Sequence, residues 1–215
     1  MAAVIFDLDG VLVDSRVAIS GAMNHALAAN GFAQRPAQEL YRYIGPPLAL
    51  AFAELTAQPI GSDAVEACLA AYRERYAVSS LTETVVFDGI PAALADLGHR
   101  HRLAVATSKV KVLAEPLLAA LGLRDRFEVV AGPELGAHAE DKATTIASAL
   151  AALGAEGAVM IGDTSFDVAG AHANRLTAIG VTWGIGTRTE LAAAESLVDA
   201  PADLPVAVAE LLARA

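Results

Sequence analysis

The sequence predicts an α/β fold, a doubly wound, Rossmann-like parallel sheet that carries one inserted, all-helical segment. Two observations support this prediction. Short apolar runs alternate with longer segments of helical spacing through most of the chain, which is typical of a parallel sheet covered by helices. The alternation is interrupted between residues 15 and 83, where no run resembles a strand.

Five short apolar runs are predicted to be strands. Each is bounded by glycine or by polar residues, and its apolar character on both faces indicates burial within a parallel sheet. The five runs cover residues 3–7, 103–107, 127–131, 158–162 and 177–181.

Helices are predicted between these strands. Residues 91–97, 113–121 and 142–153 have helical spacing, and each segment ends in leucine followed by glycine. Glycine directly after a helix readily adopts the left-handed conformation that ends it.

The segment without strands is predicted to be a helical insertion after the first strand. Helical spacing covers residues 17–30, 37–44, 47–55 and 63–76. The alternative is that these helices simply cover the sheet, but so many consecutive helices without a return strand favour a separate unit. We therefore expect a core of residues 1–14 and 84–215 and a helical unit of residues 15–83.

Composition and charge restrict the class of function. The 215 residues are 55% hydrophobic and carry a formal net charge of −10, which works against nonspecific binding of nucleic acid. No apolar stretch reaches the roughly 18 residues of a membrane span, and the first apolar run does not resemble a signal peptide. With Cys68 as the single cysteine, no intramolecular disulfide can form. We expect a cytoplasmic monomer or homodimer that binds neither nucleic acid nor a membrane.

Polar side chains follow several of the predicted strands. They are Asp7 and Asp9 after the first strand, Thr107 and Ser108 after the second, Lys142 at the start of a later helix, and Asp163 and Asp167 after the fourth strand. Ligands of doubly wound sheets bind beyond the carboxyl ends of the strands, so we expect these side chains to converge.

Such a set has a coherent chemistry. Several carboxylates near one point bind a hard divalent cation, and Mg²⁺ suits a site shared with a phosphate. Hydroxyls and free N–H groups at a strand-to-helix turn favour a phosphoryl group. One carboxylate can attack phosphorus and form an aspartyl-phosphate, while a second moves the proton.

Each residue also has an ordinary explanation. Aspartate beside glycine is common in turns, Thr107 and Ser108 can cap a helix, and Lys142 can be a solvated surface charge. Asp7 together with Asp163 and Asp167 after another strand favours a functional site.

Four segments, in order, resemble the motifs of the haloacid dehalogenase-like hydrolase superfamily. The sequence DLDGVLVDS at residues 7–15 resembles the first motif, Thr107-Ser108 the second, Lys142 the third, and GDTSFD at residues 162–167 the fourth. One departure is Ala143, which follows Lys142 where many members have proline.

The resemblance implies roles for the acids. Asp7 would be the nucleophile and a Mg²⁺ ligand. Asp9 would be the general acid/base and would bind the metal through its backbone carbonyl. Asp163 would be the other protein ligand, with Asp167 and Gly10 in supporting positions, Asp167 either on the metal or behind its ligands.

The resemblance also implies how a substrate is held. Thr107, Lys142 and the backbone N–H of Ser108 would bind the transferring phosphoryl group. The helical insertion would be the family's cap, and Arg42 within it would contact the rest of the substrate. A surface arginine without that role is the alternative for Arg42.

With an acid at position 9, two residues after Asp7, the sequence resembles the phosphatase branch of the superfamily, because the dehalogenases lack this acid. Residues 180–186 resemble phosphoglycolate phosphatase-like members, and so do residues 44–48, which also resemble relatives described as 5′-nucleotidases. We expect a phosphatase of small phosphorylated metabolites, with phosphoglycolate as the leading substrate. A 5′-nucleotidase, a sugar-phosphate phosphatase, a phosphomutase and a non-catalytic, phosphate-binding regulatory module are the alternatives.

Overall fold

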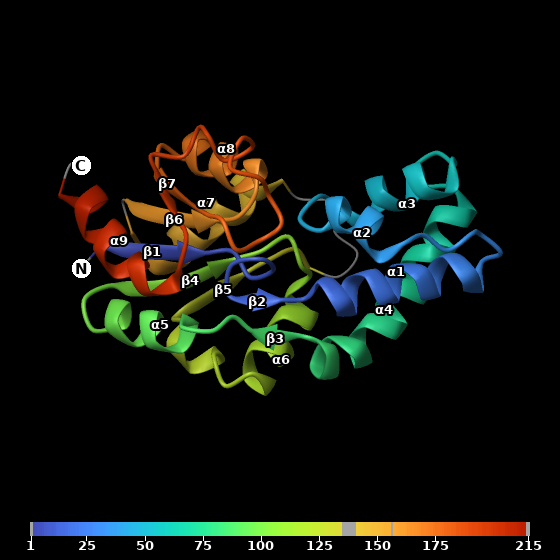
Figure 1. Cartoon of the computed structure of the whole chain (residues 1–215), viewed down its shortest axis with the longest axis horizontal. Helices are drawn as coiled ribbons and strands as arrows, with labels where there is room; N and C mark the ends of the chain where they lie inside the picture. Colours follow the sequence, from blue (N-terminus) through green and yellow to red (C-terminus); the bar gives the residue numbers. More distant parts are fainter. Residues whose placement is uncertain (1, 135–140, 156, 214–215) are drawn as a thin grey trace. The chain divides into compact units, whose positions relative to one another are not determined.

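The computed structural model of the chain (Figure 1) describes residues 2–134, 141–155 and 157–213. The chain divides into two compact units. One comprises Met1–Asp14 and Val86–Ala215, and the other comprises Ser15–Val85.

The first unit is built on a parallel sheet of six strands in the order β5-β4-β1-β6-β7-β8. The strands are β1 (Ala3–Phe6), β4 (Arg102–Ala106), β5 (Val129–Ala131), β6 (Ala158–Gly162), β7 (Thr177–Val181) and β8 (Ser196–Val198). Five of them match predicted strands, and the predicted fold class is confirmed. The sixth strand, β8, was missed because two of its three residues are partly exposed.

Three of the predicted strands differ at their boundaries. The strand predicted at residues 103–107 runs from Arg102 to Ala106, so Thr107 lies beyond it. The first strand ends at Phe6 rather than at residue 7, so Asp7 lies beyond the ladder. The third predicted strand begins at Val129 rather than at residue 127, because Phe127 ends a short 3₁₀ turn, η2 (Arg124–Arg126).

Helices cover both faces of this sheet (Figure 1). Alternate residues of β1 point to opposite faces, as expected for a strand. Val4 and Phe6 join the apolar cluster formed with α5 (Ile90–Gly98), α6 (Lys111–Ala120) and α9 (Leu204–Leu212). Ala3 and Ile5 join the cluster formed with the opposite helices, α7 (Lys142–Leu153) and α8 (Ser165–Ala173).

The strand order determines where a ligand can bind. Numbered along the chain, the six core strands have the order 3-2-1-4-5-6, which reverses direction between its first and fourth members. Ligands of doubly wound sheets bind at this switch point, outside the carboxyl ends of the strands. Here these are the ends of β1 and β6, which are followed by Asp7 and Asp163.

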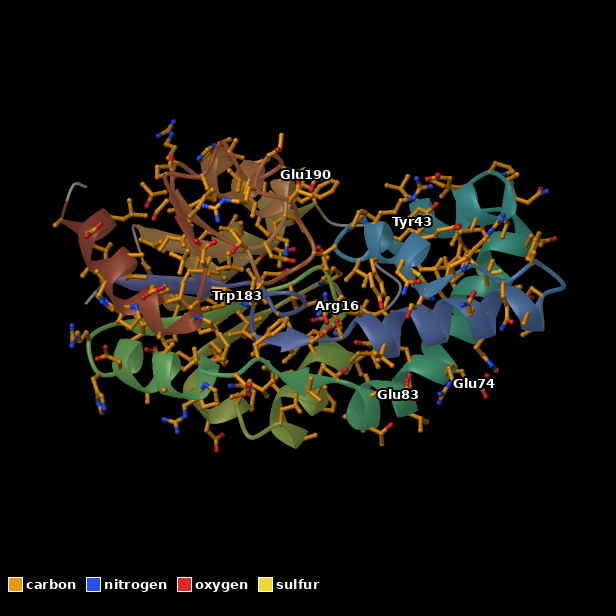
Figure 2. All side chains as sticks on the ribbon, viewed as in Figure 1. Arg16, Tyr43, Glu74, Glu83, Trp183 and Glu190 are labelled. Carbon is orange, nitrogen blue, oxygen red and sulfur yellow. The ribbon has the colours of Figure 1, made fainter. Side chains whose placement is uncertain are left out.

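The second unit is helical. Its elements are α1 (Arg16–Ala29), α2 (Ala37–Leu40), η1 (Tyr41–Tyr43), α3 (Leu48–Thr56) and α4 (Asp63–Glu83). The predicted helix 37–44 is a short α-helix that continues as a 3₁₀ turn. Helix α4 runs seven residues past its predicted end at 76, as far as Glu83, which Figure 2 labels near the end of the helix.

Two short strands, β2 (Val13–Asp14) and β3 (Val85–Val86), form a separate two-stranded sheet. None of the helices in the described segments has both the length and the apolar character needed to span a membrane.

Candidate active site

Three buried carboxylates meet at the switch point of the sheet. Asp7 follows β1, while Asp163 and Asp167 follow β6. The register aligns Phe6 with Ile161, and the Asp7 backbone N–H donates to the Ile161 carbonyl at 2.9 Å. One oxygen from each of the three carboxylates lies within 4.8 Å of the other two. Parallel pairing of β1 and β6 therefore brings together acids that are more than 150 residues apart.

Lys142 lies against two of these acids. Its Nζ is 2.8 Å from Asp7 Oδ1 and 2.9 Å from Asp167 Oδ1, and it donates to the Ala106 carbonyl at 3.3 Å. Helix α7 begins at Lys142 because Asp141 caps it, accepting from the Thr144 N–H at 2.7 Å. One buried ammonium thus contacts two of the three buried carboxylates.

Burial and the neighbouring charges shift the pKa values of Asp7, Asp163 and Lys142. Burial raises the pKa of Asp7 to about 7, against the opposing effect of Lys142 and with a further contribution from Asp167. Burial also raises the pKa of Asp163 well above its usual value, and the charges of Asp167 and Asp7 add to this. For Lys142, burial lowers the pKa, but the charges of Asp167 and Asp7 outweigh it and the net shift is upward. The site therefore has more negative charge than its lysine balances.

The arrangement fits a bound divalent cation. Asp163 Oδ2 accepts from the Ile185 N–H at 2.8 Å, but Asp163 Oδ1 is buried without a hydrogen-bond donor among the described residues. A buried charged oxygen without a partner is destabilising. Carboxylate oxygens are the ligands that Mg²⁺ prefers, so a cation beside Asp7 and Asp163 would satisfy this oxygen and balance the charge.

Both oxygens of Asp167 are already engaged. Oδ1 faces Lys142, and Oδ2 accepts from the Thr164 N–H at 3.0 Å and from the Thr164 hydroxyl at 2.8 Å. The second pair of contacts closes the capping box that starts α8. Asp167 is thus placed to hold Lys142 and the start of α8.

Asp9 lies in the tight turn that follows β1. Gly10 N–H donates to the Val13 carbonyl at 2.9 Å and closes this turn. The Asp9 side chain is paired with Lys109, whose Nζ lies 2.7 Å from Asp9 Oδ1. Lys109 was not among the predicted site residues, although its position directly after Thr107-Ser108 at a strand end was a usable signal.

Glycine is required where the turn approaches Asp163. Gly10 has a φ of +90°, and a Cβ at this position would overlap Asp163 Oδ2. A Cβ at Gly184, in the loop after β7, would overlap the same side chain. In that loop Trp183, labelled in Figure 2, donates from its indole Nε1 to the Val11 carbonyl at 3.1 Å. The loop thus supports both Asp163 and the turn that carries Asp9.

Thr107 and Ser108 lie at the end of the neighbouring strand. The register aligns Phe6 with Val105, so Thr107 lies one residue beyond the level of Asp7. Thr107 is buried and its hydroxyl accepts from the Lys109 N–H at 3.1 Å, while Ser108 is partly exposed. Their contact with a phosphoryl group stays a prediction.

The family follows from comparison with known proteins. A family model described as haloacid dehalogenase-like hydrolase matches residues 4–181, which is well over half of the chain. The chain belongs to this family. The matched region includes all four segments that carried the resemblance.

Two relatives of this haloacid dehalogenase-like hydrolase have names that bear on its chemistry. A 5′-nucleotidase of Pseudomonas aeruginosa is 39% identical over 88% of this chain and 86% of the relative. A phosphoglycolate phosphatase of Caulobacter vibrioides is 31% identical over 98% of this chain and 92% of the relative. The family and these names confirm the predicted enzyme class, a phosphoric monoester hydrolase.

A solved structure agrees with this assignment. The crystal structure of a predicted phosphatase from Clostridium acetobutylicum superposes on this hydrolase with a TM-score of 0.91 and 32% sequence identity. The match covers 98% of this chain and 99% of the other.

Arg42 lies in the helical unit of the hydrolase. Its guanidinium donates to the Tyr43 hydroxyl at 2.6 Å and is paired with Glu54. The Arg42 side chain is 65% exposed, so both predicted explanations, a substrate contact and a surface charge, remain open for it.

Proposed function

We propose that this chain is a Mg²⁺-dependent phosphatase that hydrolyses small phosphorylated metabolites through an aspartyl-phosphate on Asp7. The observation that carries the proposal is the buried cluster of Asp7, Asp163 and Asp167 with Lys142 among them. A buried set of acids with one cation suits phosphoryl transfer, which depends mainly on positioning and on charge stabilisation.

Asp7, Asp163 and the backbone carbonyl of Asp9 would hold the Mg²⁺ ion. When bound, the ion would neutralise charge on the acids and on the incoming phosphoryl group. Asp167, with both oxygens engaged, would act behind these ligands by holding Lys142 in place.

The two chemical steps use Asp7 and Asp9. In the first, an Asp7 oxygen attacks phosphorus, the ester P–O bond breaks, and Asp9 gives its proton to the leaving oxygen. In the second, Asp9 takes a proton from water, the water oxygen bonds to phosphorus, and the bond from phosphorus to Asp7 breaks. Inorganic phosphate is released, and Asp7 and Asp9 return to their starting states.

The phosphoryl group would be held by the Thr107 hydroxyl, the Ser108 N–H and Lys142. Residues 15–83 would be the cap that the resemblance implies, and Arg42 in that cap would contact the rest of the substrate. Closure of a cap of this kind excludes water during transfer and selects the substrate.

Phosphoglycolate is the proposed substrate, supported by the relative of that activity that aligns over nearly the whole chain. Nucleoside 5′-monophosphates are the second candidate, because the relative named 5′-nucleotidase is more similar in sequence. The predicted cytoplasmic location and oligomeric state remain predictions.

A panel of phosphate esters tests this proposal. We expect hydrolysis of phosphoglycolate, and of an aryl phosphate, that requires Mg²⁺ and is abolished by a chelator. Comparison of kcat/KM across phosphoglycolate, nucleoside 5′-monophosphates and sugar phosphates ranks the candidate substrates. Absence of Mg²⁺-dependent hydrolysis on the whole panel would refute the proposal.

The variant Asp7→Asn tests the nucleophile. It should reduce turnover to the background rate while circular dichroism shows an intact fold, because the amide keeps the shape of the side chain but not its nucleophilic oxygen. Mass spectrometry of acid-quenched wild-type protein should detect a phosphorylated Asp7. Substantial activity in Asp7→Asn would show that another residue attacks phosphorus.

A further inference from the structure

The ion pair between Lys109 and Asp9 joins two strand ends of the α/β unit. The 2.7 Å contact links Lys109 Nζ to Asp9 Oδ1, and the two side chains are only 6% and 11% exposed. Exposed ion pairs contribute little because solvent screens them and their side chains are mobile. A nearly buried pair instead fixes the geometry of both groups, and removal of one partner leaves an uncompensated charge.

The backbone on the lysine side is held in place. The Lys109 N–H donates to the Thr107 hydroxyl at 3.1 Å. Gly132, just after β5, lies so close that a Cβ there would be 2.6 Å from the Lys109 carbonyl oxygen. Lys109 therefore projects from a fixed point at the end of β4.

The backbone on the aspartate side is held as well. Asp9 forms a β-bridge with Val13, and the Val13 N–H donates to the Leu8 carbonyl at 3.1 Å. What remains adjustable is the rotation of the Asp9 carboxylate, and the described residues provide one polar partner for it, Lys109. Because Lys109 holds Oδ1, proton transfer falls to Oδ2.

We propose that Lys109 is a positioning residue, whose ammonium orients the Asp9 carboxylate so that Oδ2 can exchange a proton with the leaving group and with water. This inference rests on the proposed function, in which Asp9 is the acid/base. In the proposed role, Lys109 acts only through Asp9. A lysine that bound the substrate directly would contribute to catalysis even without Asp9.

Two substrates with different leaving groups separate these roles. General-acid assistance is needed for an alkoxide, whereas nitrophenolate leaves readily without a proton. Loss of a correctly placed acid should therefore lower kcat/KM for an alkyl phosphate by about tenfold or more and that for nitrophenyl phosphate by much less. The test variants are Lys109→Met and Lys109→Arg. The control is Lys111→Met, which removes the same positive charge at an exposed neighbouring position.

The expected pattern is a larger loss on the alkyl than on the aryl phosphate in Lys109→Met, with partial recovery in Lys109→Arg and no loss in Lys111→Met. In an Asp9→Asn background, Lys109→Met should change kcat/KM by less than about twofold, because coupled residues are not additive. Mg²⁺ affinity, measured by calorimetry, should change little in Lys109→Met, since the side chain that Lys109 is paired with, Asp9, is not one of the three clustered acids.

Equal losses on both substrates, or the same loss with and without Asp9, would overturn the inference and indicate direct contact with the substrate. If Lys109→Met does not fold, the role of Lys109 is tested by comparing Asp9→Asn with the double variant Asp9→Asn/Lys109→Met. Neither of these variants contains an Asp9 carboxylate that has lost its lysine partner. Wild-type protein that is inactive on the whole panel would overturn the proposed function together with this inference. Active wild-type protein with additive variants would overturn only the role of Lys109.

Discussion

At the scale of single residues, the site is defined by an imbalance of charge. Asp7, Asp163 and Asp167 share one ammonium, that of Lys142, and all four side chains are buried. Burial of like charges is unfavourable unless a proton or a cation compensates them. The raised pKa values of Asp7 and Asp163 favour compensation by a bound proton, and a bound metal ion would provide compensation by a cation.

The pH dependence of Mg²⁺ binding should follow from this competition. The pKa of Asp7 is raised from 3.8 to about 7 in the metal-free site, so below pH 7 the ion must displace a proton. Metal ligands must be deprotonated, and the affinity should therefore rise from pH 6 to pH 8. Calorimetric titration in buffers of different ionisation enthalpy would detect the released proton. An affinity that does not change across this range would contradict the prediction.

At the scale of elements, the turn after β1 packs directly against Asp163. Its conformation depends on Gly10, which has a positive φ and lies against Asp163. The turn is also held by Trp183 through the Val11 carbonyl, while the adjacent Ile185 N–H holds Asp163. The loop after β7 therefore supports both Asp163 and the turn that carries Asp9, although none of its side chains is a candidate for catalysis.

Gly10→Ala should damage the metal site as well as the fold. The change combines backbone strain, about 1–3 kcal/mol for a non-glycine residue at positive φ, with overlap between its Cβ and Asp163. Gly122→Ala is the matched control, because Gly122 has a φ of +70° but no atom within 4 Å of an added Cβ. Urea unfolding should show a loss of stability in both variants, larger for Gly10→Ala. Calorimetry should show weaker Mg²⁺ binding only for Gly10→Ala, and equal effects would contradict the overlap.

At the scale of the whole molecule, parallel strand pairing creates the site. Asp7 and Asp163 are brought to the same edge because β1 and β6 are neighbours in the sheet. In the unfolded chain these acids are far apart, so the proposed metal site can form only when the sheet has formed. Metal binding should therefore stabilise the folded protein.

Thermal unfolding with and without Mg²⁺ measures this stabilisation. Mg²⁺ at 100 times its dissociation constant should add about 2.7 kcal/mol to the free energy of unfolding, so the chelated protein should melt at a lower temperature. Asp163→Asn should lose most of this difference because it removes a ligand. Asp125→Asn, at an exposed position in η2, should keep it. A melting temperature that Mg²⁺ does not change would argue against a metal in this cluster.

Much of the fold could be predicted from local patterns. Strands β1 and β6 are apolar throughout, strands β4 and β7 are apolar after their first residue, and helix α7 begins at Lys142 as expected. Strand β8 was missed because it is partly exposed and therefore lacks a continuous apolar pattern. The last seven residues of α4 were missed because they lack a continuous apolar face. Val78 and Leu81 are exposed there, whereas Ser79 and Ser80 are buried.

Strand composition and motif order are local properties, so the fold class, the family resemblance and the residues that could carry the chemistry were predictable from the sequence. Which of these groups touch became clear in the folded structure. The pair of Asp9 with Lys109, the two oxygens of Asp167 and the Ile185 N–H on Asp163 all depend on strand ends that are neighbours in space but distant in the chain. Such contacts are set by sheet order and register, which no local pattern specifies.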